Sequence, residues 1–103
     1  MPDAVPDEHA AFTVLASIGL QGVRLVQPTL GETVVVYGLG LIGLVTVQLL
    51  QASGCRVIGI DINEQRLRLA EAFGAKAIHA ASGSDPVTAV NAMTAARGAD
   101  AVL

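Results

Sequence analysis

Gly38, Gly40 and Gly43 have the spacing of a glycine-rich turn that can bind phosphate groups through its main chain. A run of β-branched residues at 33–36 leads into the turn, and an apolar segment follows it. Gly38 would permit a tight turn, Gly40 would let the backbone approach a pyrophosphate without an intervening Cβ atom, and Gly43 would let a helix pack closely. The spacing therefore predicts a dinucleotide-binding turn between a strand and a helix.

Leu41 and Ile42 would open the helix that follows this turn. Amides in the first turn of a helix have no intrahelical acceptor, and the helix dipole is positive there, so we expect these two N–H groups to face diphosphate oxygens. Asp61 ends the next predicted strand, eighteen residues after Gly43. A carboxylate at this position can accept hydrogen bonds from both hydroxyls of an adenosine ribose.

Asp61 also bears on which dinucleotide is bound. A 2′-phosphate beside it would bring like charges within a few Å, at a cost on the order of 4 kcal/mol at a surface-type dielectric. The sequence thus favours NAD over NADP. Arg66, five residues further on, could lie over the ribose edge or be a solvated helix residue. If NADP were the cofactor, Arg66 would be the expected ligand of its phosphate.

Each of these residues also has an explanation that involves no ligand. The glycines could form a strand–helix turn that binds nothing, and Asp61 could be an ordinary cap at a strand end. The other residues of chemical interest are isolated and match no nucleophile or metal-binding pattern: His9, Tyr37, Cys55 and His79. We expect only His79 near the predicted crevice, and an inert Cys55. The prediction is a binding site without catalytic residues or metal ligands.

Hydrophobic periodicity and turn residues divide the chain into alternating helices and strands. Strands are expected at about residues 33–38, 56–61, 76–80 and 100–103. Helices are expected over about residues 8–26, from the glycine turn to Gly54, over 64–73 and from Pro86 to Arg97. The expected N-caps are Asp7, Asn63 and the pair Ser84-Asp85. This alternation predicts an α/β fold: a partial Rossmann, doubly wound parallel sheet of order 3-2-1-4 with a leading helix.

Composition favours one domain, with residues 1–6 as a linker and 7–103 as a truncated NAD(P)-binding Rossmann domain. The 103 residues carry a net charge of -3 with scattered cations, so nucleic acid is not an expected partner. The uncharged residues between Glu32 and Arg56 include glycines and glutamines, which favour a buried strand and helix over a membrane span. One cysteine and no signal-peptide pattern predict a cytoplasmic protein.

Six segments occur in a characteristic order along the chain: residues 8–12 (EHAAF), 28–36 (PTLGETVVV), 38–43 (GLGLIG), 59–61 (GID), 70–75 (AEAFGA) and 98–100 (GAD). Together they resemble the cofactor-binding domain of the medium-chain dehydrogenase/reductases, in the zinc-type alcohol dehydrogenase branch. The resemblance implies that a set of residues contacts NAD(H): Gly38, Gly40, Leu41, Ile42, Gly43, Asp61 and Arg66. Family members hold the substrate and a catalytic zinc in a separate GroES-like domain.

The resemblance thus implies the NAD(H)-binding portion of an alcohol-dehydrogenase-like oxidoreductase, which exchanges hydride between nicotinamide and an alcohol or carbonyl. Without its catalytic domain, such a portion is not expected to be catalytic. Zinc-type members commonly supply a cysteine zinc ligand from the leading helix, whereas residues 13–17 are TVLAS, so no zinc is expected in this segment.

The alternative function is an NAD-sensing regulatory module of the potassium-channel and transporter type. Such modules share the glycine turn, an Ile-Asp strand end and a later Ala-Asp-Ala-Val segment. They usually open directly on the first strand, so the leading helix favours the dehydrogenase. In either case the predicted sheet has unpaired edge strands, and we expect the chain to self-associate.

Overall fold

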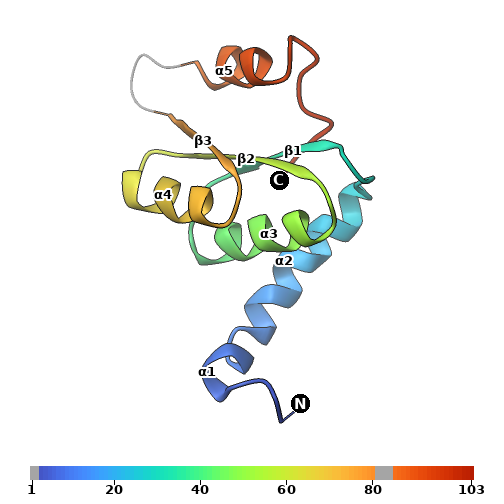
Figure 1. Ribbon diagram of the computed structural model, residues 1–103, viewed down its shortest axis with the longest axis vertical. Helices are drawn as coiled ribbons and strands as arrows, with labels where there is room; N and C mark the ends of the chain where they lie inside the picture. The colour runs from blue at the N-terminus through green and yellow to red at the C-terminus, as the bar shows by residue number, and fades with distance from the viewer. Residues whose placement is uncertain (1–2, 81–84) are drawn as a thin grey trace.

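The computed structural model describes residues 3–80 and 85–103 and places a parallel sheet of four strands at their centre (Figure 1). The strands are β1 (Thr33–Tyr37), β2 (Arg56–Asp61), β3 (Lys76–His79) and β4 (Ala101–Val102). Their spatial order is β3-β2-β1-β4, so the predicted Rossmann-type order 3-2-1-4 is confirmed. Backbone hydrogen bonds from Asp100 to Thr33 and from Leu103 to Val35, both 2.8 Å, continue the β1–β4 pairing beyond the assigned strand.

Helices cover both faces of the sheet (Figure 1). On one side lie α2 (Thr13–Val26), α3 (Leu41–Ala52) and α4 (Glu64–Ala72), with the short α1 (Asp7–Ala10) leading into α2. On the other side lies α5 (Pro86–Met93). Parallel strands joined by helices on both faces form the doubly wound arrangement that the alternating pattern predicts.

The core is divided by the sheet because successive side chains of a strand point to opposite faces. Val34 and Val36 pack in the cluster that contains Leu50 of α3. Val35, between them, packs in a second cluster with Val90 of α5. All three valines of β1 are almost fully buried, which explains why the sequence of this strand is continuously apolar rather than alternating.

The leading helix is not continuous, contrary to the prediction for residues 8–26. The chain leaves the helical ladder at residues 11–12 and starts again at Thr13. The Thr13 hydroxyl donates to the Ala10 carbonyl at 2.6 Å, a local side-chain bond that competes with an unbroken helix. Asp7 is the first helical residue and Pro6 is the N-cap, so the prediction of Asp7 as the cap was also wrong.

The last helix ends at Met93, four residues before the predicted end at Arg97. Ala95 and Ala96 have positive φ angles of 51° and 65°, which a right-handed helix cannot contain. The other two caps behave as predicted. Asn63 accepts from the Arg66 amide at 3.2 Å, and Asp85 accepts from the Val87 amide at 3.1 Å. Ser84, predicted with Asp85, lies outside the described residues.

Candidate functional site

The glycine turn lies at the carboxyl end of β1, where the chain passes from the sheet into α3. Gly38 has a φ of 92°, a left-handed conformation that disfavours any residue with a Cβ atom. Its amide donates to the Ile60 carbonyl of β2 at 2.8 Å, so the turn is fastened to the neighbouring strand. The predicted tight-turn role of this glycine therefore matches its backbone conformation.

The other two glycines have opposite surroundings. A Cβ atom on Gly43 would clash with the carbonyl oxygen of Gly38, so the absence of a side chain lets α3 pack against the turn. A Cβ atom on Gly40 would meet nothing within 4 Å. Gly40 is therefore not required by internal packing, and the space above its main chain is open to a ligand.

Gly40 is also the N-cap of α3, and no side chain caps this helix end. Its carbonyl accepts the Leu44 amide at 2.9 Å, which leaves the amides of Leu41, Ile42 and Gly43 as the first-turn donors without an intrahelical acceptor. The side chains of Leu41 and Ile42 are partly exposed beside them. A helix end with free donors and a positive dipole is a favourable place for an anion.

The Asp61 side chain joins the glycine turn to the loop after β2. One carboxylate oxygen accepts the Leu39 amide at 2.7 Å, and the other accepts the Asn63 amide at 2.8 Å. Asp61 is only 7% exposed, yet each oxygen keeps a lone pair beyond the bond it makes. The sequence pattern indicated the carboxylate but not its main-chain partner Leu39, because a backbone amide has no residue signature.

Asp61 is ionised at neutral pH. Burial alone would raise its pKa, but the hydrogen bonds from the Leu39 and Asn63 amides, together with the nearby Ile62 amide and the Arg66 charge, outweigh burial and hold the pKa below the ordinary value. Arg66 is exposed on the first turn of α4. The structure thus brings Asp61 to the glycine turn and leaves the Arg66 guanidinium in solvent close enough to favour the ionised carboxylate.

A groove of about 610 Å³ runs beside the turn. One wall is the glycine turn with the start of α3, and the other is α2, with Leu15, Ile18 and Gly19 among its lining residues. Sequence reasoning assigned no part of the site to α2. The signal that could have indicated it is the small residue Gly19, where a Cβ atom would approach the Thr46 hydroxyl of α3 to 2.7 Å, so the two helices are in close contact.

Of the other candidate residues, Tyr37 lies beside the turn, contrary to the expectation that only His79 would be near the crevice. His79 bonds the Ile62 carbonyl through Nε2 at 2.8 Å. Burial, with a smaller effect of Glu32, raises the pKa of the Cys55 thiol, which fits the inert cysteine that was predicted. Tyr37 is 60% exposed and lines the groove.

The arrangement of residues 3–80 and 85–103 also bears on metal binding and on membrane insertion. No three His, Cys, Asp or Glu side chains in these stretches are arranged as a metal ion would need. No helix within them combines the length and apolar character that crossing a membrane requires.

A family model described as zinc-binding dehydrogenase matches residues 42–103. The chain is also 42% identical over 98 residues to L-threonine 3-dehydrogenase of Bacillus subtilis, a match that covers 94% of this chain and 25% of that enzyme. The chain therefore spans about a quarter of the length of this curated relative.

Two solved structures extend the likeness to three dimensions. An alcohol dehydrogenase from Thermus sp. ATN1 matches with a TM-score of 0.93 and 31% identity, covering 99% of this chain and 30% of that one. A short-chain alcohol dehydrogenase from Escherichia coli, solved in complex with NADH, matches with a TM-score of 0.83 and 33% identity, covering 95% and 29%. The first match covers nearly the whole chain and thus includes the leading helices.

Proposed function

The chain belongs to the zinc-binding dehydrogenase family, in the zinc-type alcohol dehydrogenase branch of the medium-chain dehydrogenase/reductases, and we propose that it binds NAD(H) at the glycine turn. The proposal rests on the arrangement of three features at this turn. The main chain at Gly40 is open to approach, the unbonded amides of α3 begin beside it, and an ionised Asp61 is hydrogen-bonded to the same turn. The likeness to dehydrogenases, which includes the leading helices, favours this function over an NAD-sensing regulatory module.

The residue roles follow from this geometry. The amides of Leu41 and Ile42 bind the diphosphate, which approaches over Gly40, while Gly38 and Gly43 keep the turn and the helix in place. Asp61 accepts hydrogen bonds from the ribose hydroxyls with the lone pairs that Leu39 and Asn63 leave unused.

The preference for NAD over NADP rests on the charge of Asp61. A 2′-phosphate would meet a buried carboxylate that is ionised and fastened by two amide donors, so the carboxylate cannot turn away without losing both bonds. Arg66 lies over the ribose edge in this proposal and balances part of the Asp61 charge.

The bound nicotinamide supplies the hydride acceptor or donor. The described residues bind and orient the dinucleotide, and the α2 wall of the groove excludes water from one side of the turn. We assign the alcohol or carbonyl substrate, and the groups that act on it, to the catalytic domain of the parent oxidoreductase. The absence of zinc in this segment and a cytoplasmic setting stay predictions.

We also propose that the chain self-associates through its sheet edges. Within the described sheet, β3 and β4 are the edge strands. Near the β4 edge the side chains of Tyr37 and Val102 are 60% and 63% exposed. Unpaired strand edges with exposed apolar side chains promote association. Sedimentation of a monomer at all accessible concentrations would contradict this part of the proposal.

The test of the cofactor is a titration of the purified chain with NADH and with NADPH, followed by nucleotide fluorescence. We expect NADH to bind about tenfold more tightly or better, and Asp61→Asn to narrow that ratio because it removes the charge. Asp85→Asn is a matched control, since Asp85 caps α5 on the other face of the sheet. Equal affinity for the two nucleotides, or no binding of either, would refute the assignment of NAD.

A further inference from the structure

The edge of the sheet opposite the glycine turn contains a second pocket, of about 430 Å³. In a parallel sheet all amino ends meet at one edge, and Thr33, Arg56 and Lys76 are the first residues of β1, β2 and β3. All three line this pocket, as do residues around the end of α5. Arg56 and Asp61 are the two ends of β2, about 16 Å apart at the usual rise of a strand, so the pocket is separate from the proposed nucleotide site.

The charged residues that line this pocket are all cations. Arg56, Lys76 and Arg97 line it, which is half of the six lysines and arginines of the chain, while no aspartate or glutamate is among its described lining residues. The chain as a whole carries a net charge of -3. A local excess of cations in a concave site on an acidic chain attracts anions.

Arg56 and Lys76 lie on the same face of the sheet. Thr33 is in register with Arg56, and Lys76 is in register with Ile58, which shares a face with Arg56 two residues away. Two cations on one face of neighbouring strands repel each other. Neither Arg56 nor Lys76 forms an ion pair with another described residue. The salt bridge found among the described residues joins Arg97 to Asp100.

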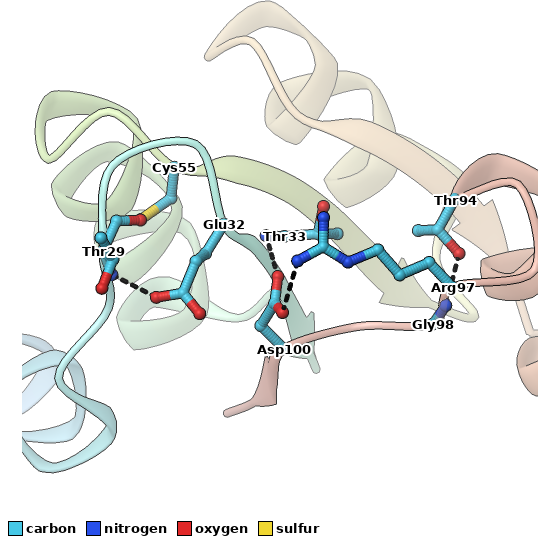
Figure 2. A network of polar contacts seen from close by, with 8 residues as sticks. All are labelled: Thr29, Glu32, Thr33, Cys55, Thr94, Arg97, Gly98 and Asp100. Atoms are coloured by element: carbon cyan, nitrogen blue, oxygen red, sulfur yellow. Dashed lines mark hydrogen bonds and ion pairs between the residues drawn. The ribbon is translucent and has the colours of Figure 1, made fainter.

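Arg97 is held over the same edge by Asp100. The Asp100 carboxylate accepts the Thr33 amide at 2.8 Å through one oxygen and Arg97 at 3.4 Å through the other (Figure 2). Glu32, the other carboxylate of the network, accepts the Thr29 amide and does not line the pocket. Asp100 thus positions the third cation without itself lining the cavity.

We infer that this pocket binds a phosphate-class polyanion through Arg56, Lys76 and Arg97. Two guanidinium groups and an ammonium group match the several oxygens of a phosphate or pyrophosphate group. The Thr33 hydroxyl adds a neutral donor, and the raised pKa of Cys55 keeps its thiol uncharged, so it does not oppose an anion. The volume is within the range of small-ligand pockets.

The test is a titration of the isotope-labelled chain with inorganic pyrophosphate, followed by amide chemical shifts. We expect saturable shifts at Thr33, Arg56 and Lys76. Arg56→Gln and Lys76→Gln should each weaken binding about fivefold to tenfold. Both side chains are exposed, so neither change should disturb folding. Arg68→Gln, which removes an exposed charge on α4, is the matched control and should leave the affinity unchanged.

Pyrophosphate also probes the glycine turn, and the positions of the shifts separate the two sites. Shifts confined to residues 38–43 would support the proposed nucleotide site and overturn the inference of a second site. The absence of saturable shifts at the amino edge with millimolar pyrophosphate would overturn it as well. So would an equal loss of affinity in Arg56→Gln and Arg68→Gln, because it would indicate attraction by net charge alone.

Discussion

Substitution of Gly40 by alanine should separate nucleotide binding from folding. The residue has φ and ψ of -68° and -166°, an extended backbone that alanine adopts without strain, and its Cβ atom would enter open space. Alanine lowers the entropy of the unfolded chain, which stabilises by about 0.4–1 kcal/mol, but it is a poorer N-cap than glycine by a similar amount. The free energy of unfolding should therefore change by less than about 1 kcal/mol.

The neighbouring glycines provide the contrast. Gly43→Ala would push a Cβ atom into the Gly38 carbonyl, a backbone group that cannot yield without moving the turn or the helix, at a cost of about 1–3 kcal/mol. Gly38→Ala would place alanine at a φ of 92°, at a cost of about 1–2 kcal/mol. Only Gly40→Ala should keep the stability of the parent chain.

The affinity for NADH, unlike the stability, should be sensitive to Gly40→Ala. A methyl group at Gly40 occupies the space through which a diphosphate reaches the amides of Leu41 and Ile42. The loss of one charge-assisted hydrogen bond is worth about 1.5–3 kcal/mol, so NADH affinity should fall at least about tenfold. Urea unfolding and NADH titration of the same sample measure both quantities. A folded Gly40→Ala chain that binds NADH as tightly as the parent would refute the proposed approach over this residue.

Two further predictions concern stability. The pKa of Asp61 is lower in the folded chain than its ordinary value of 3.8, so the stability that the ionised carboxylate confers should be complete well above that pH and be lost as the pH falls through the folded pKa. Urea unfolding should show that the difference in free energy of unfolding between the parent chain and Asp61→Asn shrinks in acid. A difference that does not change with pH would contradict this prediction. Ala96→Gly should stabilise the chain by about 0.5–1 kcal/mol because it relieves a positive φ, whereas Ala92→Gly inside α5 should destabilise it by about 1 kcal/mol in the same assay. Destabilisation by both would show that residue 96 is not strained.

The sequence predicted the parts of the fold that local chemistry decides. Residues 33–36 form a strand because β-branched residues buried on both faces fit the centre of a parallel sheet. Asn63 caps α4 because its side chain reaches an amide in the first turn. The strand order follows because right-handed crossovers between parallel strands leave few topologies.

Other features of the fold could not be predicted because they depend on contacts that residue types alone do not indicate. The interruption before Thr13 is accompanied by a hydroxyl bond to the Ala10 carbonyl, which the spacing of apolar residues does not indicate. Ala95 and Ala96 adopt a conformation that glycine or asparagine usually marks, so the early end of α5 had no signal. The three cations at the amino edge are far apart in sequence, and only the sheet register brings two of them to one face.

Asp61 shows why effects on nucleotide binding and effects on folding are difficult to separate in this chain. Its carboxylate fastens the glycine turn through Leu39 and the loop to α4 through Asn63, so the charge that would select the ribose also holds together the two segments that would surround it. Any substitution at Asp61 therefore changes folding and binding at once. Gly40 contributes only open space and main chain to the same site. A loss of NADH affinity in Gly40→Ala with the stability intact would therefore locate the dinucleotide at this turn, whereas a loss of affinity in an Asp61 variant could also come from altered folding.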